Sequence, residues 1–308
     1  MIIDTETHVF HRLLPTETNP EVSLVHRYSW HAYTGDLLVA EMDRAGVDKT
    51  FLISYDAESV GYDLVQRGKS PEDFLGGRKY TLSYVRKYPD RFIWFNTLSM
   101  PRLHRDYLDL LRADLDDGAS GVKIFVAHHE MALDDPQLMA VFEICARHGG
   151  RVLLSFEATN PPRTPSVRDL LEQLPSVLDA FSQVSFLVMH GGQTRPSAPE
   201  SQSFFRAMKA RTNVWLSTAL VDAPAPGDDP KFGWKDGWEY PFHHYLAWLH
   251  DLSTAVGVER LMWATDWPWM EHLVPYPQAV DSPRLHADFW TADDKDRFFG
   301  RNASTFLR

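Results

Sequence analysis

Short apolar runs alternate with longer amphipathic stretches along most of the chain. Eight runs have the length and the β-branched or aromatic content of buried strands, namely 1–6, 50–54, 92–97, 121–126, 151–156, 184–189, 213–217 and 260–264. The stretches between them repeat apolar residues at helical spacing. Segment 35–48, for example, is predicted to form a helix with one apolar face made of Leu37, Leu38, Met42 and Ala45.

Strands that alternate with helices indicate βαβ units and a parallel sheet. Eight units in 308 residues predict an α/β fold with one domain, 1–308, built as a (β/α)₈ TIM barrel. An open doubly wound sheet is the alternative, but its first strand usually leads into a glycine-rich turn, and here it leads into Glu-Thr-His. Two long loops, 11–34 after strand one and 221–240 after strand seven, are expected on the catalytic face. A closing helix is predicted near the end, from 291 to 308.

Composition narrows the classes of partner. The net charge of −11 disfavours nucleic acid and anionic membranes, because both need basic surfaces. No leader pattern and no apolar run of membrane-spanning length is found, so we expect a cytoplasmic protein. The single cysteine, Cys145, cannot form an internal disulfide and is expected in the core. The expected partner is a small, anionic substrate, and a homodimer is compatible with the sequence.

Side chains that can bind metals stand at the ends of several predicted strands. Glu6 and His8 end strand one, two residues apart and therefore on the same face. Glu157 follows strand five, His190 follows strand six, and Asp266 follows strand eight. A single histidine at a strand end is more often a hydrogen-bonded structural residue. Because barrel strands converge at their carboxyl ends, the coincidence predicts one divalent ion, Zn²⁺ or Mn²⁺, bound by Glu6, His8, His190 and Asp266.

The chain resembles the amidohydrolase-related family of metal-dependent (β/α)₈ barrels. The stretches "IIDTETHVF", "GASGVKIF", "MHGG" and "LMWATDWP" carry the resemblance, which covers almost the whole sequence. This family includes 2-pyrone-4,6-dicarboxylate lactonase and the decarboxylases of γ-resorcylate and aminocarboxymuconate semialdehyde. The resemblance implies that Glu6 and His8 stand at the two positions of a metal-binding motif that usually reads His-x-His. It also implies that His190 is a ligand and that Asp266 is a ligand or a base.

Two further residues have open roles under this resemblance. Glu157 stands where many members of the wider superfamily have a ligand histidine, so it could bind metal, act as an acid or base, or only accept hydrogen bonds. Lys123 is similar to the carbamylated lysine of two-metal members, but it lies early in its strand. A lysine that fills the barrel or reaches the surface is favoured, and with it one metal ion rather than two.

The resemblance implies two reactions. In hydrolysis, the metal activates a water that opens a lactone or amide-type bond in a small, carboxylated cyclic substrate, with Asp266 as base and Glu157 as a second catalytic candidate. The alternative is non-oxidative decarboxylation of an aromatic or cyclic acid. Glu6 favours decarboxylation, whereas "TDWP" and "HGGQT" favour hydrolysis, which we prefer. A barrel without metal that only binds a ligand would leave the Glu6 and Asp266 charges close together at a cost in stability.

Substrate recognition is expected from the long loops. The guanidinium group of an arginine can donate two parallel hydrogen bonds to a carboxylate, although each arginine taken alone is more often part of a surface ion pair. The predicted substrate-binding residues are Arg12, Arg27, His128, His129, Arg195, Trp234 and Trp238.

Overall fold

Eight parallel strands form the centre of the protein, and they are the eight that the sequence predicts. The computed structural model describes residues 1–9, 33–54, 78–98, 106–126, 131–156, 165–223 and 239–308. The strands are β1 (Ile3–Thr7), β2 (Lys49–Ile53), β3 (Phe92–Thr97), β4 (Gly121–Phe125), β5 (Arg151–Ser155), β6 (Ser185–Val188), β7 (Val214–Ala219) and β8 (Leu261–Ala264). Each pairs in parallel with the next, in the order β1 to β8. The (β/α)₈ barrel is therefore confirmed.

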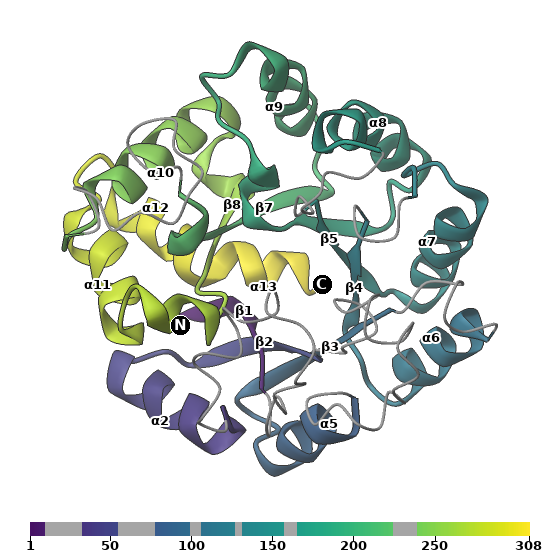
Figure 1. The fold of residues 1–308 in the computed structure, drawn as a ribbon, viewed down its shortest axis with the longest axis horizontal. Coiled ribbons are helices and arrows are strands. Elements are labelled where there is room, and N and C mark those ends of the chain that lie inside the picture. The colour runs from purple at the N-terminus through teal and green to yellow at the C-terminus, as the bar shows by residue number, and fades with distance from the viewer. Residues whose placement is uncertain (10–32, 55–77, 99–105, 127–130, 157–164, 224–238) are drawn as a thin grey trace, which may run out of the picture.

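Helices surround the strands as a ring (Figure 1). Among the described residues they are α2 (Gly35–Ala45), α5 (Arg78–Lys87), α6 (Tyr107–Asp116), α7 (Pro136–His148), α8 (Val167–Ala180), α9 (Gln202–Lys209), α10 (His243–Val256) and α11 (Tyr276–His286). Helix α2 follows its predicted pattern, with Thr34 accepting a hydrogen bond from the Leu37 amide at its start and Gly46 in the left-handed conformation at its end. Its buried face contains Leu38, Met42 and Ala45, but Leu37 is exposed, so that part of the prediction is wrong.

The last part of the chain differs from the single closing helix predicted for 291–308. It forms α12 (Ala292–Asp296), a π-helical turn (Arg297–Arg301) and α13 (Asn302–Phe306). Helix α11 was not predicted, because Pro277 and Pro283 interrupt its helical pattern.

Two apolar layers hold the barrel together. The larger one lies between the sheet and the surrounding helices and includes Cys145, which is buried as expected. The smaller one fills the barrel interior and continues onto α13. The Phe306 ring lies 5.9 Å from Phe51 and 5.6 Å from Trp215, and its carbonyl accepts a hydrogen bond from Arg151 at the start of β5. Helix α13 therefore covers the amino ends of the strands, as Figure 1 shows, and leaves the carboxyl ends for chemistry.

The seam between β8 and β1 closes the barrel differently from the other strand pairs. It has one isolated parallel bridge, between Thr7 and Trp267, beyond the end of β8. The His8 amide donates to the Trp267 carbonyl at 2.8 Å, and the Asp266 amide donates to the Glu6 carbonyl at 3.0 Å. These contacts join the two strand ends on which metal ligands are predicted.

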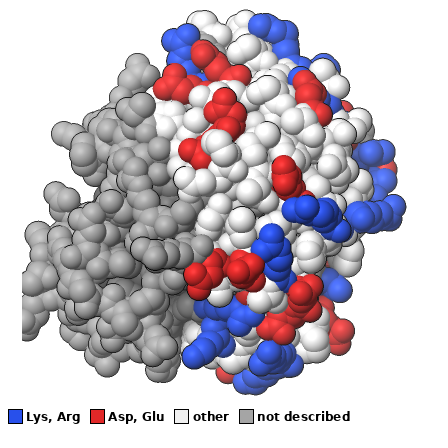
Figure 2. All heavy atoms as spheres, turned by 90° about the vertical axis from the view of Figure 1, so that its right-hand side faces the viewer, with Lys and Arg blue, Asp and Glu red and all other residues white. Residues whose placement is uncertain are grey.

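Charged side chains of both signs are mixed on the outer face over α6 and α7 (Figure 2). The ion pairs Arg112–Asp109 and Arg147–Glu143 link successive turns of these two helices. Within the described part of the chain, no helix is both long enough and apolar enough to cross a bilayer.

Candidate metal centre and active site

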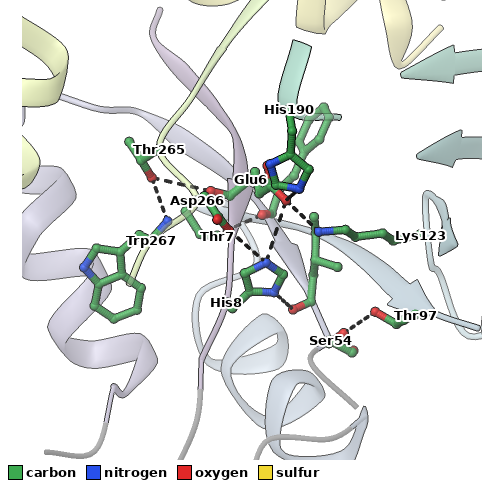
Figure 3. Close-up of polar contacts among 12 residues, drawn as sticks. Glu6, Thr7, His8, Ser54, Thr97, Lys123, His190, Thr265, Asp266 and Trp267 are labelled. Atoms are coloured by element: carbon green, nitrogen blue, oxygen red, sulfur yellow. Dashed lines mark hydrogen bonds and ion pairs between the residues drawn. The ribbon is translucent and has the colours of Figure 1, made fainter. Parts of the chain in front are cut away.

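Glu6 and His8 project from the end of β1 into the mouth of the barrel (Figure 3). Their side chains are 0% and 2% exposed. His8 Nδ1 lies 3.1 Å from the carbonyl oxygen of Ile53. Because a carbonyl only accepts, Nδ1 carries the proton and donates, so the lone pair of the neutral ring lies on the other nitrogen, which can act as a ligand. That nitrogen, Nε2, lies 3.5 Å from Asp266 Oδ1 and 3.9 Å from Glu6 Oε1.

Asp266 completes this group from the turn that follows β8. Its backbone has a φ of 56°, a left-handed conformation that is uncommon outside glycine and that tends to occur at functional sites. The hydrogen bond from its amide to the Glu6 carbonyl fixes this turn against β1. Burial, together with the neighbouring Glu6 carboxylate, raises the pKa of Asp266 to about 6. The side chain is 13% exposed, so it is the member of the group that solvent reaches.

Lys123 is a barrel-filling lysine, and the surface alternative is wrong. Its side chain is 2% exposed, and Nζ donates to Glu6 Oε1 at 2.6 Å. The ammonium also lies 4.6 Å from the centre of the Phe125 ring. Burial of Glu6 opposes its ionisation, but the positive charges of His190 and Lys123 hold the pKa of Glu6 well below its usual range. Glu6 is therefore a carboxylate with one oxygen already paired.

His190 begins a left-handed turn directly after β6. The turn, His190–Gln193, has φ values of 56°, 59°, 69° and 51° at its four residues. Glycine is required at the second position, where a Cβ atom would lie 2.2 Å from the Trp248 ring. The turn directs His190 Nε2 to 3.6 Å from Glu6 Oε1. His190 Nδ1 lies 3.1 Å from both carboxylate oxygens of Asp222.

Asp222 and Asp4 also belong to this region, although neither is among the site residues predicted from the sequence. Asp222 ends a short 3₁₀ turn, Leu220–Asp222, directly after β7. Asp4 is fully buried and accepts hydrogen bonds from the Glu6 amide, from the amide and hydroxyl of Thr265 and from the Tyr276 hydroxyl. Burial raises the pKa of Asp4 to about 7. Only their positions in the sequence could have indicated a role. Asp222 is an acid shortly after a predicted strand, and Asp4 is an acid inside the first strand.

The donors present fit a divalent cation. Glu6, His8 and Asp266 each offer one ligand atom, and these atoms lie within 4.8 Å of one another. Two more buried atoms, Glu6 Oε2 and His190 Nε2, have no hydrogen-bond partner. Buried polar atoms are nearly always paired, so two unpaired ones that face the same group fit a cation-binding site. The mixture of imidazole and carboxylate suits Zn²⁺ or Mn²⁺.

The structure brings together Glu6, His8, His190 and Asp266 and leaves the other predicted site residues undecided. Arg195 is described and its side chain is exposed, so its contact with a substrate stays a prediction. The other predicted residues lie outside the described part of the chain, namely Arg12, Arg27, His128, His129, Glu157, Trp234 and Trp238. Most of the loops 11–34 and 221–240 also lie outside it.

A barrel with ligand-type residues at the carboxyl ends of its first, sixth and eighth strands has the architecture of a barrel enzyme whose catalytic face can hold a metal ion. The family model described as Amidohydrolase matches residues 3–308, and the chain belongs to this family. No curated protein matches the sequence.

Solved structures that resemble this chain include both hydrolases and decarboxylases. One is a probable 2-pyrone-4,6-dicarboxylic acid hydrolase from Acinetobacter baumannii with citric acid bound, at 16% identity and a TM-score of 0.67, covering 99% of this chain and 98% of that one. Another is 5-carboxyvanillate decarboxylase from Novosphingobium aromaticivorans with manganese and 4-hydroxy-3-methoxy-5-nitrobenzoic acid. It has 15% identity and a TM-score of 0.60, and the match covers 100% of this chain and 96% of that one. The decarboxylase of the same name from Sphingomonas paucimobilis has 18% identity and a TM-score of 0.58, and the match covers 100% of this chain and 98% of that one. At these identities the likeness shows the fold.

Proposed function

We propose that the protein is a metal-dependent hydrolase that opens a lactone or amide-type bond in a small, carboxylated cyclic substrate. The observation that carries this proposal is the difference in exposure within the ligand group. Glu6 and His8 are sealed inside the barrel, whereas Asp266 is partly open to solvent. A carboxylate that can contact both the bound ion and incoming water is suited to act as a general base.

Glu6, His8 and Asp266 would hold the ion, with His190 as a fourth ligand. When bound, a divalent ion supplies a Lewis acid that acidifies water and polarises a carbonyl group. Asp266 accepts the proton of the attacking water and returns it to the leaving oxygen or nitrogen. Its pKa of about 6 without metal is lowered by a neighbouring dication, so the carboxylate is ionised at neutral pH. Lys123 holds Glu6 by one oxygen and leaves the other for the ion.

The substrate class is supported by the ligands of similar structures. The hydrolase from Acinetobacter baumannii is named for a dicarboxylic acid and has citric acid bound. The Novosphingobium aromaticivorans decarboxylase has a substituted benzoic acid bound. Cyclic and aromatic carboxylic acids are therefore the compounds to assay first.

Decarboxylation of an aromatic or cyclic acid is the second candidate. It is favoured by the Glu6 carboxylate, which stands in the strand-one position where a histidine is usual, and by the likeness to a manganese-containing decarboxylase over the whole chain. In this reaction the partly exposed carboxyl of Asp266 would act on the ring carbon that receives a proton.

Parallel assays in deuterated water separate the two reactions. The metal-loaded protein is incubated with cyclic esters, cyclic amides and hydroxylated aromatic acids, and the products are followed by mass spectrometry. Hydrolysis adds the mass of one water and leaves the carbon skeleton intact. Decarboxylation releases CO₂ and places one deuteron on carbon. Turnover that survives full removal of metal would overturn the metal-dependent proposal for both reactions.

A further inference from the structure

His190 has two different surroundings at its two ring nitrogens. Nε2 is buried, has no hydrogen-bond partner and lies 3.6 Å from Glu6 Oε1 (Figure 3). Nδ1 lies 3.1 Å from each oxygen of Asp222. An ionised carboxylate can only accept hydrogen bonds, so Nδ1 must carry a proton and donate it. In the neutral ring this leaves the lone pair on Nε2, which is the atom directed toward the proposed metal.

Asp222 is held where it can impose this state on the ring. It follows β7 through the Leu220–Asp222 turn, which is closed by a hydrogen bond of 3.1 Å from the Ala223 amide to the Leu220 carbonyl. Leu220 and Ala223 are 1% and 4% exposed. The end of β7 is fixed in turn by Tyr245 of α10, whose hydroxyl donates to the Thr218 carbonyl at 3.0 Å.

The ring itself is fixed from the other side. The left-handed turn that starts at His190 packs its Gly191 against Trp248, with no room for even one methyl group. Backbone placement thus determines where the imidazole lies, while the contact with Asp222 determines its rotation and its tautomer. Carboxylate–histidine–metal arrangements of this kind orient the ligand and increase its basicity.

We propose that Asp222 is a positioning residue: it keeps His190 in the Nδ1–H tautomer and presents the Nε2 lone pair to the metal. This inference rests on the proposed metal-dependent function for its consequence, but the tautomer can be tested without metal or substrate. Asp222 acts through His190 and is assigned no contact with the reacting atoms.

The decisive variant is Asp222→Asn, which keeps the volume and removes the obligate acceptor. The amide group of asparagine can donate to Nδ1, which would move the lone pair away from Nε2. Long-range ¹H–¹⁵N NMR of metal-free protein is recorded above the pH at which the His190 ring becomes neutral, with the His190 signals assigned by their loss in His190→Ala. It should show Nδ1–H in the wild type and loss of that single state in Asp222→Asn. The signals of His8, which donates from Nδ1 to a backbone carbonyl, serve as an internal control.

Metal affinity gives the second measurement, by competition of a chelator for Mn²⁺ and Zn²⁺. Loss of a carboxylate behind a metal-binding histidine typically lowers affinity by about 10–100-fold, and we expect this range for Asp222→Asn and Asp222→Ala. Asp222→Glu, which keeps the acceptor, should recover part of the loss. Asp251→Asn is the matched control, since Asp251 stands beside His250 on the exposed face of α10 and should leave affinity unchanged. If Asp222→Ala does not fold, Asp222→Asn alone decides.

Two results would overturn the inference: a wild-type His190 whose neutral ring carries its proton on Nε2, or an Asp222→Asn protein whose tautomer and metal affinity match the wild type. A wild-type protein that binds neither metal would instead reject the proposed function, while the NMR measurement would still decide the role of Asp222.

Discussion

Replacing Lys123 with methionine tests how the site balances its charges. The Lys123 ammonium lies 2.6 Å from Glu6 Oε1, and both side chains are buried. Methionine keeps most of the aliphatic stem and removes the charge. A Coulomb estimate at this distance gives about 6 kcal/mol with an effective dielectric constant of about 20. Desolvation of the ammonium opposes this attraction, and removal of one partner of a buried pair typically destabilises by about 3–5 kcal/mol. We expect a loss in this range for metal-free protein.

A bound divalent ion should reduce this loss, because it would supply the positive charge that Glu6 lacks in the variant. By linkage, the same ion should bind more tightly to Lys123→Met than to the wild type, from which a neighbouring ammonium repels it. The free energy of unfolding is measured in urea, once with chelator and once with excess Mn²⁺. The increase caused by Mn²⁺ should be larger in the variant.

Lys87→Met is the matched control for this experiment. Lys87 Nζ also lies 2.6 Å from a carboxylate oxygen, that of Asp36, but the two side chains are about half exposed. Solvent screening makes exposed pairs weak, so this variant should unfold almost like the wild type. The reasoning is refuted if Lys123→Met loses no more stability than Lys87→Met, or if Mn²⁺ stabilises Lys123→Met no more than it stabilises the wild type.

Three further substitutions test other parts of the site. Asp266→Asn removes the proposed base and should lower kcat by at least about 10²-fold with the fold intact; near-wild-type turnover would reject the catalytic role. Asp4→Asn replaces an acid whose pKa of about 7 in the fold lies above its pKa in the unfolded chain. Asp4 therefore stabilises the fold less as the pH rises from about 4 to 7. The loss of unfolding free energy caused by the variant, measured in urea, should be smaller at pH 8 than at pH 5. A penalty that grows with pH would contradict this. Gly191→Ala should destabilise the protein by about 2–4 kcal/mol in thermal or urea unfolding, because the new methyl group collides with the Trp248 ring and the backbone is left-handed. Gly46→Ala has a φ of 73° but free space around the new methyl group, so it should show only the cost of the left-handed backbone. Equal losses in the two variants would argue against the collision.

The barrel could be predicted from sequence because its strands are parallel and buried on both faces. Such strands read as short apolar runs, and all eight appear within a residue or two of their observed positions. Helix α11 was missed for the opposite reason, since Pro277 and Pro283 are poor helix residues that tertiary packing tolerates here. The exposed Leu37 shows the limit of a periodic pattern, which cannot define how wide the buried face of a helix is.

The convergence of Glu6, His8 and Asp266 follows from a topological rule, because strand ends of a barrel meet at one mouth whatever the details of packing. The pairs Lys123–Glu6 and Asp222–His190 do not follow from any such rule. They depend on the stagger of neighbouring strands and on the rotation of single side chains, and the residues of each pair are 117 and 32 positions apart. The charge state of the centre could therefore not be derived from the sequence.

The seam between β1 and β8 has a consequence for the order of folding. Glu6 and Asp266 are 260 positions apart, and joining chain segments so distant costs on the order of 5 kcal/mol in loop entropy. A partly folded chain without β8 would expose the unpaired edges of β1 and β7, where foreign strands can add. It would also lack Asp266, one of the four proposed cation ligands. An ion that needs ligands from both β1 and β8 would thus bind only the closed barrel. Its binding energy would stabilise the pairing of the first strand with the last.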